Sequence, residues 1–172
     1  MTLSDAQRDK LYLLRLTLLV VASFASAAAA SAQPRNLGTF GLWGAFRSPD
    51  GCYAIARPAD STHRSGDAAA SIGYWPARGA RGQLHLRLSA DKREGSAVLV
   101  RIDGRSFQLI GRGRDAWAPD ARADAELVAA MRTGLVLTAE TRSARGGLIR
   151  DQYRLQGAPT AIDAAAVACA RG

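Results

Sequence analysis

Beyond residue 32, the apolar residues of this chain occur in short runs that Gly, Pro and Asp interrupt, with no repeat and no long linker. In one run, Leu84, Leu86 and Leu88 alternate with His85 and Arg87. Such alternation places one face of a strand in a core and the other in water. The pattern is typical of an antiparallel β-sandwich or barrel. We expect strands at residues 38–46, 52–57, 70–75, 83–89, 97–102, 105–111, 135–141 and 148–155.

Turn residues support an antiparallel arrangement. Asp103 and Gly104 both tolerate a positive φ and separate two apolar segments, so they predict a tight β-hairpin. A second hairpin is expected at residues 145–147, and residues 48–51 predict a turn that leads into the next strand.

Two segments have the period of an α-helix instead. Residues 119–132 begin with Pro-Asp and carry an apolar stripe. Residues 160–170 open with Thr160 and Asp163, a variant of the capping box. We therefore expect two short helices, the second at the end of the chain.

Cys52 and Cys169 are the two cysteines of the sequence. In an oxidising compartment, an even number of cysteines near the two ends of a domain indicates a disulfide. The bond would join the last helix to an early strand and stabilise the fold by at most about 4 to 5 kcal/mol. No metal site is expected, because structural zinc needs four ligands and His63 and His85 lack ligand spacing.

The first 32 residues differ from the rest and have the pattern of a secretory signal peptide. Arg8, Lys10 and Arg15 make the start positive, and residues 16–22 form an apolar stretch. Ala30-Ser31-Ala32 supply the small residues that a cleavage point needs. We expect cleavage after Ala32 and a single exported domain, residues 33–172, in the periplasm or secreted. An uncleaved membrane anchor is the alternative, because the apolar stretch approaches spanning length if the following alanines are counted.

The chain is strongly basic, with a net charge of +8 that is carried almost entirely by arginine. An exported basic protein meets anionic lipids and acidic glycans, so no nucleic-acid partner is expected. Arg87 and Arg101 should point away from the apolar faces of their strands, and Arg105 should lie at a hairpin turn. Arginines that share one face of the sheet would form an anion-binding surface. The alternative is that the charges are scattered and only keep the protein in solution. The candidate anion-binding residues are Arg87, Arg101, Arg105, Arg112 and Arg114.

No catalytic constellation is found, and we expect neither enzyme activity nor a cofactor. The sequence has no Gly-x-Ser-x-Gly motif. Asp115, Asp120 and Asp124 lie around Trp117, a combination that suggests glycoside chemistry. Asp120 stands at a predicted helix N-terminus, however, where a negative charge is favourable. These carboxylates are therefore interpreted as structural.

The aromatic and glycine-rich segments are also interpreted as structural. Trp43, Tyr74 and Trp75 are expected to pack in the core or on the sheet. Residues 111–114, Gly-Arg-Gly-Arg, lack the Gly-Lys-Ser/Thr ending of a phosphate loop.

Residues 37–46 (LGTFGLWGAF), 52–58 (CYAIARP) and 161–169 (AIDAAAVAC) resemble the invasion-associated locus B family of exported Gram-negative bacterial proteins. The resemblance extends over the whole mature chain. It implies an immunoglobulin-like β-sandwich with short helices, located in the periplasm or envelope, with no established enzyme activity.

The function expected on this basis is a non-enzymatic binding or structural module. It would contact an anionic envelope component or a protein partner, and peripheral contact with a membrane is compatible with it. The alternative is a secreted or surface virulence or adhesion factor.

Overall fold

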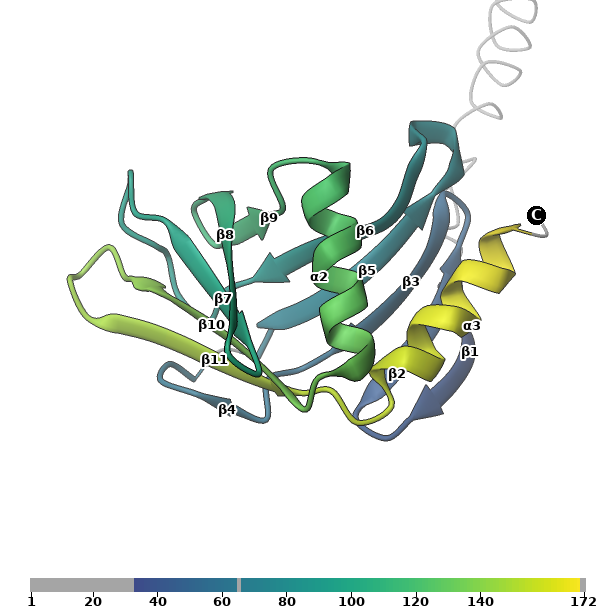
Figure 1. Cartoon of the computed structure of the whole chain (residues 1–172), viewed down its shortest axis with the longest axis horizontal. Coiled ribbons are helices and arrows are strands. Elements are labelled where there is room, and N and C mark those ends of the chain that lie inside the picture. Colours follow the sequence, from purple (N-terminus) through teal and green to yellow (C-terminus); the bar gives the residue numbers. More distant parts are fainter. Residues whose placement is uncertain (1–32, 65, 171–172) are drawn as a thin grey trace, which may run out of the picture. The chain divides into compact units, whose positions relative to one another are not determined.

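The computed structural model describes residues 33–64 and 66–170. The expected signal peptide and its cleavage point after Ala32 lie outside the described residues. Within them, the fold is mainly β, with antiparallel strand pairs, two α-helices and one disulfide, as expected (Figure 1). None of the helices in this part of the chain is long and apolar enough to span a membrane.

The strands form one continuous sheet with the order β1-β2-β3-β5-β6-β9-β8-β7-β10-β11-β4. Strand β8 pairs with both β9 and β7, so it joins two segments of the sheet. Buried side chains from both segments share one core, which makes the fold sandwich-like. The strands are β1 (Arg35–Phe40), β2 (Trp43–Ser48), β3 (Gly51–Ala56), β4 (Asp60–Ser61), β5 (Ala69–Trp75), β6 (Ala80–Arg87), β7 (Val98–Ile102), β8 (Arg105–Arg112), β9 (Asp115–Trp117), β10 (Val136–Arg142) and β11 (Leu148–Arg154).

The alternation that predicts the sheet is visible in β6. Leu84 and Leu86 are fully buried, whereas His85 and Arg87 are half-buried on the opposite side of the strand. The hairpin between β7 and β8 is also confirmed. Its two turn residues, Asp103 and Gly104, have φ values of 43° and 85°, which a tight hairpin of this kind requires.

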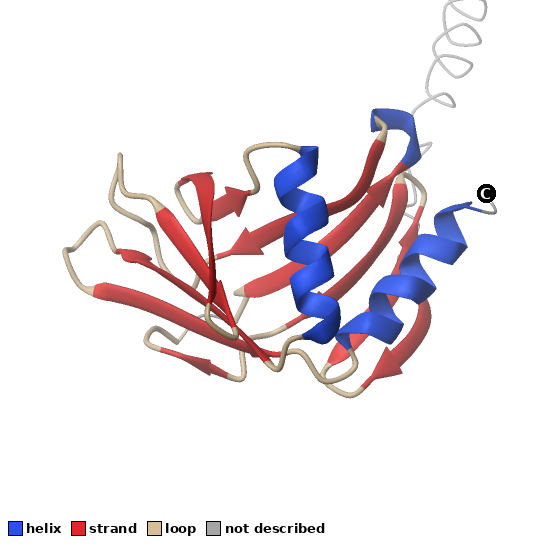
Figure 2. Cartoon of the chain, in the orientation of Figure 1, coloured by secondary structure: helices blue, strands red, loops and turns tan. Residues whose placement is uncertain are grey.

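Helices α2 (Ala121–Thr133) and α3 (Ala158–Ala170) lie on the same side of the sheet (Figure 2). Helix α2 packs on β6, and α3 packs mainly on β2 and β3. The Asp120 carboxylate caps α2 by accepting a hydrogen bond of 2.8 Å from the backbone N–H of Ala123. Side chains of α3 that face the sheet are mostly alanines, and these small residues let the helix approach the strands closely.

The expected disulfide is present. Cys52 of β3 and Cys169 of α3 are bonded, and their Cα atoms lie 5.7 Å apart. The bond therefore fastens the last helix to an early strand, as the sequence predicts.

Two local predictions are wrong. Residues 38–46 were expected to form one strand, but the chain reverses at Gly41 and forms the β1–β2 hairpin. Gly41 has a φ of 59°, which permits a tight reversal without side-chain strain. Thr160 was expected to cap the last helix, but α3 already begins at Ala158. The hydrogen bond from the Ala161 N–H to the Gly157 carbonyl closes the first helical turn, so Thr160 lies within that turn.

Candidate functional site

We call outer face the side of β2, β3, β5, β6, β9 and β8 that points away from α2 and α3. Residues in register on neighbouring antiparallel strands point to the same side of a sheet. Arg87 of β6 lies opposite Asp115 of β9, which in turn lies opposite Arg112 of β8. These three side chains form one line across the outer face, which we call the arginine row.

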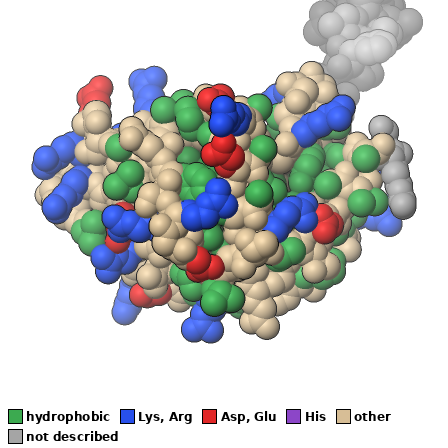
Figure 3. All heavy atoms as spheres, viewed as in Figure 1, with side chains coloured by type: hydrophobic (Ala, Val, Ile, Leu, Met, Phe, Trp, Pro, Cys, Tyr) green, Lys and Arg blue, Asp and Glu red, His purple; other side chains and the backbone are tan. Residues whose placement is uncertain are grey.

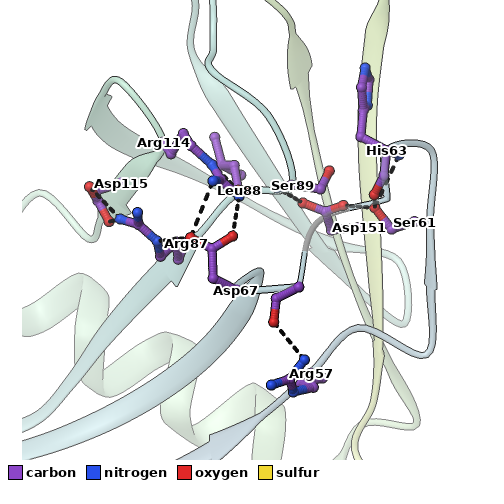
Figure 4. Close-up of polar contacts among 11 residues, drawn as sticks. Arg57, Ser61, His63, Asp67, Arg87, Leu88, Ser89, Arg114, Asp115 and Asp151 are labelled. Atoms are coloured by element: carbon purple, nitrogen blue, oxygen red, sulfur yellow. Dashed lines mark hydrogen bonds and ion pairs between the residues drawn. The ribbon is translucent and has the colours of Figure 1, made fainter.

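Asp67 lies in the segment between β4 and β5, and it links the arginine row to Arg114 in the turn between β8 and β9. Its carboxylate accepts hydrogen bonds from Arg87 Nε at 2.9 Å and from Arg114 Nη2 at 2.8 Å (Figure 4). Arg114 Nε also donates to the Leu88 carbonyl at 2.9 Å. The hydrogen bond that Arg87 donates to Asp67 and the charge of Asp115 raise the pKa of Arg87 above its usual value. The hydrogen bonds thus hold both guanidinium groups in fixed positions.

An aromatic pair stands beside the arginine row. His85 Nε2 lies 2.9 Å from Asp115 Oδ1, and the His85 ring stacks on Trp117 with a centroid separation of 5.3 Å. Arg87 Nη1 approaches the same Asp115 carboxylate at 3.2 Å. Asp115 is therefore shared between an arginine and a histidine, and His85 lies on the wet side of its strand, as expected.

Two candidate arginines have no carboxylate partner within the described chain. Arg112 is exposed, and its side chain makes no hydrogen bond or ion pair with any described residue. Arg105 is exposed at the start of β8, where its guanidinium lies 5.2 Å from the centre of the Phe107 ring. Arg105 thus sits at the hairpin turn, at the far end of β8 from Arg112.

Arg101 belongs to a different cluster. It lies on β7, which β9 and β8 separate from β6. Arg101 Nη1 donates to Glu140 of β10 at 2.6 Å, and Arg150 of β11 donates to the same carboxylate at 2.6 Å. The structure thus brings Arg87, Arg112 and Arg114 together and places Arg101 and Arg105 elsewhere. That these arginines bind anions stays a prediction.

The helix-covered side also carries many charged side chains. On the face shown in Figure 3, basic side chains lie among acidic and apolar ones, and several of them gather at the left end of the view. Arg122 and Glu126 of α2, for example, form an i,i+4 ion pair of 3.1 Å.

The carboxylates considered for catalysis have structural partners. Asp115 holds Arg87 and His85, and Asp120 caps α2. Asp124 Oδ1 accepts a hydrogen bond from the Leu84 N–H, and burial raises the pKa of Asp124. Among the described residues, no group of three or more His, Cys, Asp and Glu side chains is arranged to hold a metal ion.

A buried polar cluster was not predicted. Asp151 is fully buried and accepts hydrogen bonds from the Ser61 hydroxyl and from the Ser89 N–H at 2.9 Å (Figure 4). This contact holds the short strand β4 and the segment that follows β6 against β11. The signal in the sequence is that Asp151 occupies the same alternating positions as Ile149 and Tyr153, both of which are core residues.

The fold and the site together define a small, disulfide-closed, antiparallel β-protein with two helices on one side of its sheet and a charged outer face. Among solved structures, the chain is similar to the crystal structure of invasion associated protein B from Bartonella henselae, with a TM-score of 0.54 and 18% sequence identity. The match covers 73% of this chain and 92% of that one. At this identity the likeness shows the fold. Neither a protein-family model nor a curated protein matches the sequence.

Proposed function

We propose that the protein is an exported, periplasmic or envelope-associated module without enzyme activity, and that it binds an anionic envelope component or an acidic protein partner. The observation that carries the proposal is the charge arrangement on the outer face. Among the described residues, Arg87 and Arg114 form ion pairs with Asp67 and Asp115, whereas Arg112 lies in register with Asp115 but forms no ion pair. The cluster therefore has a net positive charge.

The arrangement suits recognition of a phosphate or carboxylate group. Asp67 fixes the side chains of Arg87 and Arg114, so less conformational entropy is lost when a ligand binds beside them. The exposed Arg112 adds a guanidinium group, whose planar donors match an anion in bidentate fashion.

Export is supported by two independent features. The N-terminal segment has the pattern of a secretory signal. The disulfide between Cys52 and Cys169 is of a kind that persists in oxidising compartments and is rare in the cytosol of most organisms.

The absence of enzyme activity is proposed because the candidate catalytic groups already have structural partners. A general acid or base needs a carboxylate or histidine that can reach a substrate proton. Asp115 and His85 contact each other, Asp120 caps helix α2, and Asp124 bonds that helix to β6.

A secreted or surface-exposed virulence or adhesion factor is the second candidate. It is favoured by the name of the structural neighbour, an invasion associated protein. Detection of the protein in culture medium or on intact cells, instead of in an osmotic-shock fraction, would support this candidate.

The test is binding to vesicles of phosphatidylglycerol and phosphatidylcholine by protein produced from the full-length sequence. We expect Arg112→Gln to weaken binding about fivefold, because one arginine near an anionic surface contributes about 1 kcal/mol. Binding of the wild type should also fall as salt is added. The matched control is Arg122→Gln, which removes an exposed arginine from α2 and should change binding less. Equal binding by wild type and Arg112→Gln would contradict the assignment of the arginine row.

A further inference from the structure

A second feature of the outer face is a line of aromatic rings, which we call the aromatic row: Phe46, Tyr53 and Trp75. Phe46 lies opposite Tyr53 across β2 and β3, and their ring centroids are 5.6 Å apart. Tyr53 and Trp75 are separated by 6.4 Å, and both pairs of rings are within 24° of parallel. Each ring is half-buried, so part of it remains in contact with solvent.

Glycines beneath the aromatic row let two of its rings lie against the sheet. A Cβ atom on Gly44 would lie 2.7 Å from the Phe46 ring. On Gly51 or Gly73, it would lie 2.4 Å from the Trp75 ring. Any side chain at these positions would therefore push the rings away from the strands. The sequence keeps the rings low and stacked on one another, and thus forms an apolar patch across β2, β3 and β5.

Cations stand at both ends of the aromatic row. The guanidinium of Arg78 lies 5.8 Å from the centre of the Trp75 ring. Beyond Phe46, a groove of about 480 Å³ is lined by Ile55 and Arg57 among others. The arginine row lies on the same face, because Tyr53 is opposite Gly73 of β5, and β5 pairs with β6, which carries Arg87.

We propose that the aromatic row binds a chain of sugar residues that carries acidic groups. This inference rests on the proposed function and names the anionic component as a saccharide. The flat faces of sugar rings present C–H groups that pack on aromatic rings, while their hydroxyls point sideways to polar neighbours. Carboxylate or phosphate groups on the saccharide would contact Arg78 and Arg57 at the ends of the aromatic row, and the arginines of the arginine row.

Two other occupants fit these observations less well. A peptide that adds a strand needs a free sheet edge, but the strands of the aromatic row each have neighbours on both sides. A lipid surface is bound by apolar side chains that project outward, whereas the Phe46 and Trp75 rings lie low over glycines.

The test measures affinity for polygalacturonic acid by retardation in native gels that contain it, with protein produced from the full-length sequence. Tyr53→Ala and Trp75→Ala remove rings from the row. Gly44→Ala removes nothing and adds only a methyl group beneath Phe46, so it tests the row even if a truncated ring impairs folding. Leu99→Ala is the control, because Leu99 is an exposed apolar residue on β7, outside the row.

We expect wild type and Leu99→Ala to bind alike, and the three row variants to bind at least about fivefold more weakly. Full binding by folded Gly44→Ala and Tyr53→Ala would overturn the aromatic site and leave the proposed function standing. If wild type binds phosphatidylglycerol vesicles but not the polysaccharide, the saccharide assignment is wrong and the anion-binding function remains. Binding to neither probe would overturn both.

Discussion

The carboxylate of Asp124 accepts a hydrogen bond of 2.8 Å from the backbone N–H of Leu84. Asp124 belongs to the first turn of α2 and Leu84 to the centre of β6, so the bond fixes the helix on the sheet. Burial raises the pKa of Asp124, an effect that the Leu84 N–H opposes. The charged form of this carboxylate is therefore disfavoured in the folded protein relative to the unfolded chain.

The raised pKa of Asp124 predicts a pH-dependent effect of Asp124→Asn. A group whose pKa is raised on folding stabilises the fold at low pH and loses that contribution as the pH rises through the folded-state value. An asparagine keeps an oxygen acceptor for Leu84 but cannot ionise. The free energy of unfolding of Asp124→Asn, relative to wild type, should therefore increase between pH 4 and pH 7 in urea titrations.

Asp124→Ala separates the hydrogen bond from the charge. It leaves the buried Leu84 N–H without an acceptor and should lower the free energy of unfolding by about 1 to 3 kcal/mol. If Asp124→Asn is as unstable as Asp124→Ala at pH 7, the assigned role of the hydrogen bond is wrong.

The disulfide should be a large contributor to stability. Cys52 and Cys169 are separated by 117 positions in the sequence, and closing a loop of this size restricts the unfolded chain by up to about 4 to 5 kcal/mol. Reduction, or the double variant Cys52→Ala/Cys169→Ala, should lower the urea midpoint accordingly. A midpoint that reductant leaves unchanged, with the thiols shown to be free, would contradict this prediction.

Asp151→Ala should destabilise the fold by about 3 kcal/mol, because the buried Ser89 N–H and the Ser61 hydroxyl both lose their acceptor. Ser61→Ala is the matched control. It keeps the bond from Ser89 and should cost only about 1 kcal/mol. Thermal unfolding of the two variants measures the difference, and similar losses would show that the contact with Ser89 contributes little.

Gly157→Ala should be more harmful than other substitutions at glycines with positive φ. Gly157 has a φ of 89°, and a Cβ atom there would lie 1.8 Å from the Phe40 carbonyl oxygen. Gly95 has a φ of 74° but open space around it, so Gly95→Ala should cost only the conformational strain of about 1 to 2 kcal/mol. Urea midpoints that fall equally in the two variants would show that β1 moves aside without cost.

The strands were predictable because alternation is a local signal, and the disulfide was predictable because the chain has two cysteines. Alternation around Leu84 identifies β6, and two cysteines allow only one pairing. The β1–β2 hairpin was missed because an uninterrupted apolar segment hides the reversal at Gly41. The start of α3 was misplaced because Thr160 and Asp163 imitate a cap within the first helical turn.

The site depends on strand order, which the sequence does not reveal. Arg87 and Arg101 lie on strands that follow each other in the chain, but β9 and β8 are inserted between these strands in the sheet. Arg112 thereby becomes the neighbour of Arg87, and Arg101 joins Glu140 instead. The role of Asp67 depends on how its loop folds back, for which no pattern exists in the sequence.

We propose that this chain is an exported, disulfide-closed binding domain. The intact mass and thiol count of the protein in an osmotic-shock fraction of a Gram-negative host test export and disulfide closure together. We expect a species that begins at Gln33 and has no free thiol. A full-length species in the membrane or cytosol with two free thiols would contradict it.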